Sequence, residues 1–240
     1  MLNFRKLWHP SDVGVAPLLD VFKTIKKIPT GSVVRLGGMT DCFQPIEKRY
    51  KNTYNTIRAL NKKGIHYLIV TKSYLVATPK YLRILDPKLA HIQVSIPTNN
   101  DKVLSATDNA PRYELRKKTI ETLQDNGFDV SLRLSPFFYE TADFDELNSI
   151  NVDKCLIEFL RVKPSMVEQI KDYIDFKDYI IKEGGYRHLP LEKKIEILDK
   201  LSFKEMTVCD DVKEHYEYFK NNFNHNHEDC CNLTLNEAIT

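Results

Sequence analysis

The chain has 240 residues, of which 42% are hydrophobic and 28% charged, and its formal net charge at pH 7 is +2. This composition is typical of a globular protein with one large domain or two small ones, and the near-neutral charge argues against bulk nucleic-acid binding while leaving a local basic groove open. No apolar stretch approaches the roughly 20 residues that a membrane span needs. Residues 1–10 lack the apolar core and cleavage site of a signal peptide, so we expect a cytoplasmic protein with no membrane partner.

The first elements are a helix, a strand and a second helix. Apolar residues at helical spacing predict a helix over residues 13–28, and Pro29-Thr30-Gly31 ends it. A short apolar run predicts a buried strand over 33–36, which leads into Gly37-Gly38 and a polar loop. Pro45 and Glu47 begin a helix to about residue 63, with Gly64 as its C-terminal cap.

The same unit then repeats along the chain. Further strands are predicted over 66–70, 92–96, 128–134 and 155–159, and further helices over 79–85, 111–126, 143–150 and 165–175. Five strand–helix units at this spacing predict parallel βαβ topology, as a barrel or as a doubly wound sheet. Residues 176–240 differ: helices are predicted over 191–201 and 212–222, a sixth strand over 206–209, and a polar tail from residue 224.

Polar residues follow each of the five predicted strands. They are, in chain order, Gly37, Gly38, Thr40 and Asp41; Thr71, Lys72 and Ser73; Ser95 and Thr98; Arg133 and Ser135; Glu158 and Arg161. In a parallel barrel these strand ends converge on one mouth. Cationic side chains there suit a carboxylate or phosphate, and carboxylates suit an amine or hydroxyls. The mixture favours a zwitterionic or polyhydroxylated small molecule.

Each of these features also has a purely structural explanation. Lys72 fits a solvated strand end, Gly37-Gly38 fits a turn, and Arg133 lies inside a strand where a buried ion pair would suffice. Their recurrence at five successive strand ends is what favours a shared site.

The strand-end motifs resemble those of a known superfamily. The order Gly37-Gly38-Met39-Thr40-Asp41, Thr71-Lys72-Ser73, Val94-Ser95-Ile96 and Arg133-Leu134-Ser135-Pro136 is similar to radical S-adenosylmethionine (AdoMet) proteins, and most similar to their spore photoproduct lyase-like branch. The most specific part is Thr40-Asp41-x-x-Gln44-Pro45-x-Glu47, and the resemblance covers residues 30–162. It implies an α/β fold with a partial parallel (β/α) barrel that lacks its first strand. For the whole chain we predict three parts: a helical segment 1–30, the barrel 31–175, and a mostly helical extension with a polar tail over 176–240.

The resemblance implies AdoMet as the cofactor. By that match Gly37, Gly38, Thr40 and Asp41 line it, Lys72 and Ser95 face its methionine and ribose parts, and Arg133 meets its polar groups. Members of the superfamily hold a [4Fe–4S] cluster with Cys-x3-Cys-x2-Cys, and this spacing does not occur in the sequence. We therefore expect a truncated or degenerate member. In complete form it would generate a 5′-deoxyadenosyl radical for hydrogen abstraction from an unidentified substrate, with nucleic acid or protein as possibilities.

The five cysteines offer a weak metal candidate. The weak candidates for a metal site near the C-terminus are Cys209, Cys230 and Cys231, together with His225 and His227. Cys42 lies near the glycine loop, and Cys155 is expected in the core.

Two alternative functions stay open. One is a non-catalytic nucleic-acid-binding module, for which the basic and aromatic segment 48–54 is a candidate, although a solvated helix face explains it too. The other is a metal-free barrel enzyme acting on a sugar or phosphate, with Asp41 or Glu158 as general base.

Overall fold

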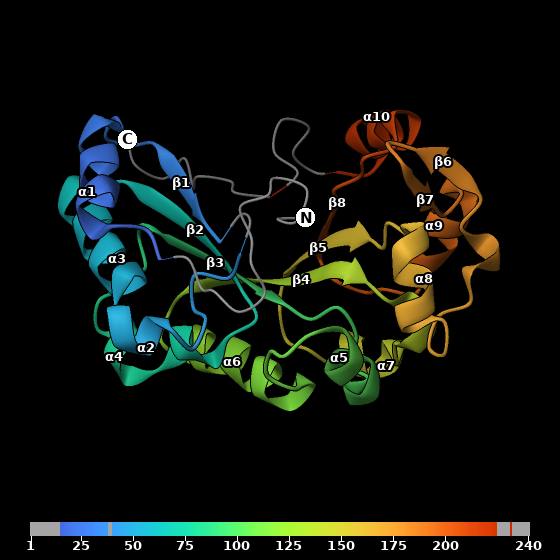
Figure 1. Ribbon diagram of the computed structural model, residues 1–240, viewed down its shortest axis with the longest axis horizontal. Helices are drawn as coiled ribbons and strands as arrows, with labels where there is room; N and C mark the ends of the chain where they lie inside the picture. The colour runs from blue at the N-terminus through green and yellow to red at the C-terminus, as the bar shows by residue number, and fades with distance from the viewer. Residues whose placement is uncertain (1–14, 38–39, 225–230, 232–240) are drawn as a thin grey trace. The chain divides into compact units, whose positions relative to one another are not determined.

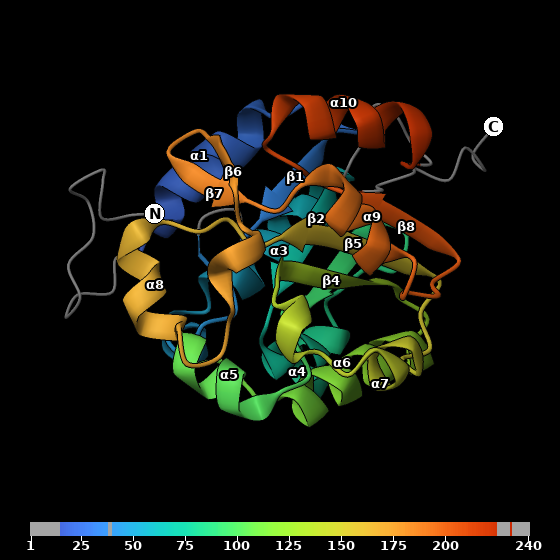
Figure 2. The same ribbon diagram turned by 90° about the vertical axis from the view of Figure 1, so that its right-hand side faces the viewer.

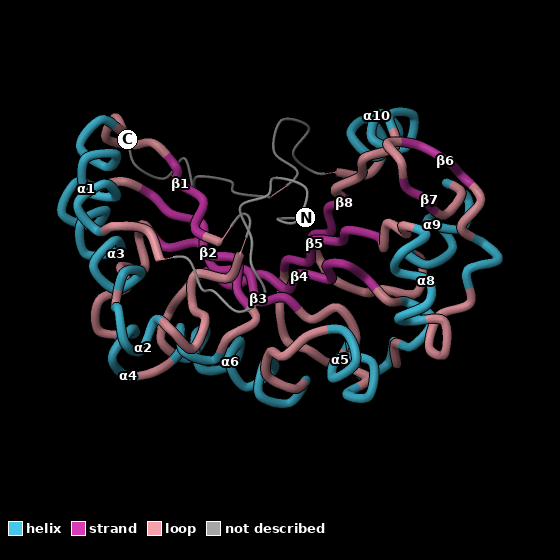
Figure 3. The backbone as a smooth tube through the Cα atoms, in the orientation of Figure 1, coloured by secondary structure: helices cyan, strands magenta, loops and turns pink. Residues whose placement is uncertain are grey.

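The computed structural model describes residues 15–37, 40–224 and 231. They form a mixed α/β fold around a six-stranded parallel sheet in the order β1-β2-β3-β4-β5-β8, which confirms the predicted fold class (Figures 1 and 3). Its strands are β1 (Val33–Leu36), β2 (His66–Thr71), β3 (Ala90–Ser95), β4 (Asp129–Phe137), β5 (Lys154–Phe159) and β8 (Glu205–Val208). The chain divides into two compact units, residues 1–93 with 122–129 and residues 94–121 with 130–240. The three-part domain division expected from the sequence stays a prediction.

The first unit carries the helices around β1 and β2. These are α1 (Leu18–Lys27), α2 (Glu47–Tyr50), α3 (Asn52–Lys63), the 3₁₀ turn η2 (Tyr74–Ala77) and α4 (Pro79–Leu82). The helix expected over 45–63 is two helices, because Lys51 adopts a left-handed conformation with φ 57° between them. Gly64 ends α3 with φ 63°, as predicted, since glycine takes this conformation without steric cost.

Strand β1 corrects one expectation. It was predicted to be buried, but none of its four residues is buried, and Val33 is 37% exposed. The reason is its place at the end of the strand order, where it pairs with β2 through Val33↔His66 to Leu36↔Ile69. Strand β2 has neighbours on both sides, and its Tyr67, Leu68 and Ile69 are at most 1% exposed.

The second unit is built on β4, β5 and β8. Strand β4 pairs with β5 through Leu132↔Cys155, and β5 pairs with β8 through Cys155↔Met206. Cys155 is 1% exposed, which confirms its predicted place in the core. The helices and turns of this unit are α5 (Asp101–Thr107), most of α6 (Tyr113–Asp125), η3 (Tyr139–Thr141), α7 (Phe144–Asn148), α8 (Pro164–Ile170), η4 (Phe176–Asp178), α9 (Leu191–Leu198) and α10 (Lys213–Asn222).

Two elements of the second unit were not predicted. Helix α5 lies between the strand predicted over 92–96 and the helix predicted over 111–126. The Asn100 side chain caps it by accepting from the Lys102 N–H at 3.1 Å. An antiparallel hairpin, β6 (Ile181–Glu183) and β7 (Tyr186–His188), interrupts the expected helical extension (Figure 2). Gly184 and Gly185 turn it with φ 59° and 79°, the conformation of a two-residue hairpin turn.

None of the helices in the described ranges combines the length and the apolar character needed to cross a bilayer.

Candidate cofactor site

The loop after β1 is held to the end of β2 by one carboxylate. Asp41 accepts hydrogen bonds from the Thr71 hydroxyl at 2.8 and 2.9 Å and from the backbone N–H of Lys72 at 2.7 Å. It also accepts from the N–H of Phe43 at 2.8 Å, which closes a turn within its own loop. Charge-assisted bonds of this kind are among the stronger ones in proteins. Asp41 therefore joins two strand ends, and its side chain is engaged by protein donors.

Gly37 makes the close approach of these two strand ends possible. Its φ is +89°, and a Cβ built there would lie 2.6 Å from the carbonyl oxygen of Val70, the penultimate residue of β2. A side chain would therefore need both a strained backbone and a displaced strand. Thr40 is exposed in the same loop, and Gly38 lies outside the described residues.

The second carboxylate of the motif, Glu47, is 4% exposed and organises the helices behind the loop. It accepts from the backbone N–H groups of Thr53 at 3.0 Å and Tyr54 at 2.9 Å, which are first-turn donors of α3 without partners inside the helix. The Tyr81 hydroxyl of α4 donates to it at 2.6 Å. The motif Thr40-Asp41-x-x-Gln44-Pro45-x-Glu47 thus encodes the local architecture of this strand end.

The second unit brings together the predicted residues from its own strands. Arg133 of β4 is 5% exposed and donates to Glu158 of β5 at 2.9 Å, and the Ser135 hydroxyl donates to the same oxygen at 2.7 Å. The Ser95 hydroxyl donates to the carbonyl of Ser135 at 2.9 Å. This arrangement agrees with the structural explanation of Arg133, an ion pair inside the protein. A cofactor role for Ser95 and Arg133 stays a prediction.

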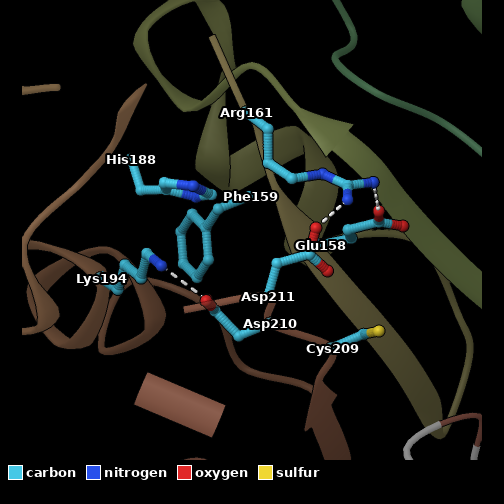
Figure 4. Close-up of a pocket in the computed structure, with 8 residues that line it drawn as sticks. All are labelled: Glu158, Phe159, Arg161, His188, Lys194, Cys209, Asp210 and Asp211. Carbon is cyan, nitrogen blue, oxygen red and sulfur yellow. Dashed lines mark hydrogen bonds and ion pairs between the residues drawn. The ribbon is translucent and has the colours of Figure 1, made fainter. Parts of the chain in front are cut away.

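A small polar pocket lies at the carboxyl ends of β5 and β8. Arg161 binds Glu158 at 2.7 Å and also pairs with Asp211, and Lys194 of α9 binds Asp210 at 2.5 Å (Figure 4). The pocket holds about 10 Å³, which is the space of one water molecule. It is too small for a nucleoside or a sugar, so we interpret it as a charge network that joins α9 to the sheet.

Lys194 is the most deeply buried cation of this network. The side chains of Lys194 and Asp210 are 1% and 3% exposed, and Nδ1 of His215 lies 2.9 Å from Nζ of Lys194. Burial lowers the pKa of Lys194, and Asp210 opposes that shift. Burial also lowers the pKa of His215, with the neighbouring ammonium as a second cause. His215 therefore accepts from Lys194 as a neutral ring.

Glu140 is a perturbed carboxyl that the sequence did not single out. It lies in η3, beyond the end of β4, where the Tyr179 hydroxyl donates to Oε1 at 3.0 Å while the buried Oε2 has no hydrogen-bond partner. Burial raises its pKa from 4.5 to about 7, so the neutral acid is stabilised in the fold. No pattern in the sequence marks such a residue, because burial causes the shift.

Cys42 and Cys155 do not fit as ligands of an iron–sulfur cluster. Burial raises the pKa of the Cys42 thiol and that of Cys155, whereas a cluster ligand must be a thiolate. In the described ranges no three His, Cys, Asp or Glu side chains are grouped as a metal site. Of the weak C-terminal candidates, Cys209 follows β8 and Cys231 is described, but Cys230, His225 and His227 lie outside the described residues.

The geometry also argues against the general-base alternative. Asp41 accepts from three different residues, and Glu158 accepts from Arg133, Ser135 and Arg161. A general base needs an oxygen that can reach a substrate proton. Both carboxylates are engaged in structural bonds instead.

Comparison with known proteins bears on the fold. The structure is similar to that of spore photoproduct lyase complexed with dinucleoside spore photoproduct, with a TM-score of 0.55 and 15% sequence identity. The match covers 84% of this chain and 64% of the other. A mutant of that enzyme with bound AdoMet and the dinucleoside matches at the same TM-score, identity and coverage. The chain has the fold of spore photoproduct lyase. This is the fold that the radical AdoMet resemblance implied.

Sequence comparison adds one relative. An uncharacterized protein of Methanocaldococcus jannaschii, MJ0683, is 27% identical in an alignment 150 residues long, which covers 59% of this chain and 55% of that protein. No protein-family model matches the chain. The chain thus spans less than two thirds of the length of these matched proteins.

Replacing Lys194 tests the buried network. Lys194→Met leaves Asp210 buried without its cation, so we expect the free energy of unfolding to fall by roughly 3–5 kcal/mol in urea denaturation. The control is Lys193→Met, whose partner Glu196 is 65% exposed at 3.2 Å, and which should cost less than about 1 kcal/mol. Equal losses in the two variants would contradict the network.

Glu140 predicts a specific pH dependence. Its pKa in the folded state, about 7, exceeds the unfolded value of 4.5, so the folded protein binds the proton more tightly. This contribution is fully present below about pH 4.5 and is lost as the pH rises through about 7. Glu140→Gln should remove this pH dependence. The stability of the variant relative to wild type should be near its low-pH value at pH 5, rise between pH 5 and 7, and be largest and constant above pH 7. Parallel stability curves for the two proteins between pH 4.5 and 7 would be the contrary result.

Proposed function

We propose that this chain binds AdoMet at the strand ends of its first unit, as a protein of the radical AdoMet type. The observation that carries the proposal is that Asp41 fixes the loop after β1 to the end of β2. Thr40 lies next to Asp41 in this loop, and Lys72 directly follows β2. Spore photoproduct lyase, whose fold the chain has, is solved with AdoMet bound in one mutant form.

The donor set suits the methionine part of AdoMet. A Thr40 hydroxyl and a Lys72 ammonium match a carboxylate, and the backbone around Gly37 can meet an amino group without an intervening side chain. Asp41 acts through the loop and is a positioning residue in this proposal. Its carboxylate accepts from the backbone N–H of Lys72 at 2.7 Å and so fixes the position from which the Lys72 side chain extends.

The proposal for these 240 residues is AdoMet binding, without reductive cleavage. A [4Fe–4S] cluster supplies the electron for cleavage in the superfamily, but the described part of the chain holds no group of three His, Cys, Asp or Glu side chains that could bind a metal. Both versions expected from the sequence, a truncated member and a degenerate one, are compatible with binding alone. A complete enzyme of this type would form a 5′-deoxyadenosyl radical from the bound cofactor, and this radical would abstract hydrogen from a substrate that the proposal leaves open.

Isothermal titration calorimetry with AdoMet tests the proposal. We expect saturable binding by wild type and a loss of roughly 10- to 150-fold in affinity in Lys72→Met, since a charge-assisted bond contributes about 1.5–3 kcal/mol. Lys88→Met is the control, because Lys88 is an exposed lysine of the same unit that precedes β3. Absence of binding by wild type, or the same loss in both variants, would refute the proposal.

A further inference from the structure

One segment of the first unit concentrates positive charge. Residues 42–85 contain nine Lys and Arg and a single acidic residue, Glu47, whereas the rest of the chain has 26 Lys and Arg against 32 Asp and Glu. The nine are Lys48, Arg49, Lys51, Arg58, Lys62, Lys63, Lys72, Lys80 and Arg83. The net charge of +2 therefore conceals a strongly basic segment in an otherwise acidic chain.

The structure shows which of these charges face solvent. Glu47 is buried and bound to α3 and α4, so no surface carboxylate of this segment offsets its cations. Lys63 is used internally, because its ammonium donates to the carbonyls of Ile25 and Lys26 at the end of α1 at 3.0 and 2.8 Å. Lys48, Arg49, Lys51, Arg58 and Arg83 are exposed.

Tyrosines join these cations into one surface on α2, η2, α3 and α4. Lys48 donates to the Tyr74 hydroxyl at 3.2 Å, linking α2 to η2. Tyr54 of α3 has two cations near its ring, Arg58 at 5.9 Å and Lys80 of α4 at 5.0 Å. We call this set the basic tyrosine surface: Lys48, Arg49, Tyr50, Tyr54, Arg58, Tyr74 and Lys80.

Its aromatic rings are accessible as well as its charges. Tyr50 is 46% exposed, beside Arg49 at 5.3 Å, and Tyr74 is 36% exposed. Exposed aromatic rings among cations are the elements of single-strand recognition, where the cations follow the phosphates and the rings stack on bases. An acidic protein would use the same charges but would have no need of the rings.

We propose that the basic tyrosine surface binds single-stranded nucleic acid. Lys48, Arg58 and Lys80 contact the phosphates, and Tyr50 and Tyr74 stack on bases. The surface is carried by the outer helices of the first unit and uses none of Gly37, Thr40 and Lys72, so its test is independent of AdoMet binding.

Fluorescence anisotropy with a labelled oligothymidylate of about 12 nucleotides tests this proposal, since single-strand sites span roughly 4–16 nucleotides. We expect binding at roughly 50 mM salt that weakens steeply as salt is added. The double variant Arg58→Glu/Lys80→Glu should bind at least tenfold more weakly, with a log–log salt slope reduced by about 1.4, or 0.7 per lost phosphate contact.

The matched control is Lys23→Glu/Lys204→Glu. It changes the net charge equally, at side chains that are 74% and 70% exposed and lie outside the surface. It should bind within about twofold of wild type. An equal loss in the control would show that only net charge matters and would overturn the proposal, as would absence of binding by wild type.

A second pair of probes tests the tyrosines and does not depend on the folding of the charge-reversed variant. An abasic strand of equal length and charge should bind wild type several-fold more weakly, and Tyr50→Ala/Tyr74→Ala should abolish that difference. If the abasic strand and polyglutamate of equal charge bind wild type as tightly as oligothymidylate, the surface fits an acidic protein instead and the proposal fails.

Discussion

The arrangement of the first unit depends on one carboxylate. Asp41 binds the hydroxyl of Thr71 and the backbone of Lys72 at the end of β2, and it closes its own loop through Phe43. Because Gly37 has no Cβ, the loop can approach the carbonyl of Val70 closely enough for these bonds to form. Gly37 and Asp41 therefore act together: the glycine allows the loop to approach the end of β2, and the aspartate bonds hold the loop there.

This constraint changes what the motif means. Asp41 and Glu47 mark the resemblance to radical AdoMet proteins, but both carboxylates are engaged within the protein, Asp41 between strand ends and Glu47 between α3 and α4. The motif shapes a strand end, and in the function we propose the ligand contacts come from its first residue, Thr40, and from Lys72. Glu47 is also the sole acidic residue of residues 42–85, and it is buried. The outer helices of this segment are therefore basic at their surface.

The sequence predicted the regular features well and the non-local ones poorly. Strand positions and the Gly64 cap follow from local periodicity and from glycine's tolerance of positive φ, and the structure confirms them. The exposure of β1 depends on its place at the end of the sheet, which a four-residue apolar run does not encode. The Gly184-Gly185 pair is typical of a two-residue hairpin turn, so the sequence does contain a local signal for this hairpin. The direction of the Asp41 side chain and the raised pKa of Glu140 arise from tertiary contacts, and no sequence pattern contains them.

Amide hydrogen exchange in Asp41→Ala tests the central claim most directly. Wild type should protect the N–H groups of Phe43 and Lys72, which donate to this carboxylate at 2.8 and 2.7 Å. We predict that the variant exchanges both on the order of tenfold faster or more. The Val208 N–H, bound to Asn224 at 2.7 Å in the other unit, should be unchanged, as should all three amides in the control Asp172→Ala. Unaltered protection of Phe43 and Lys72 in Asp41→Ala would contradict the account.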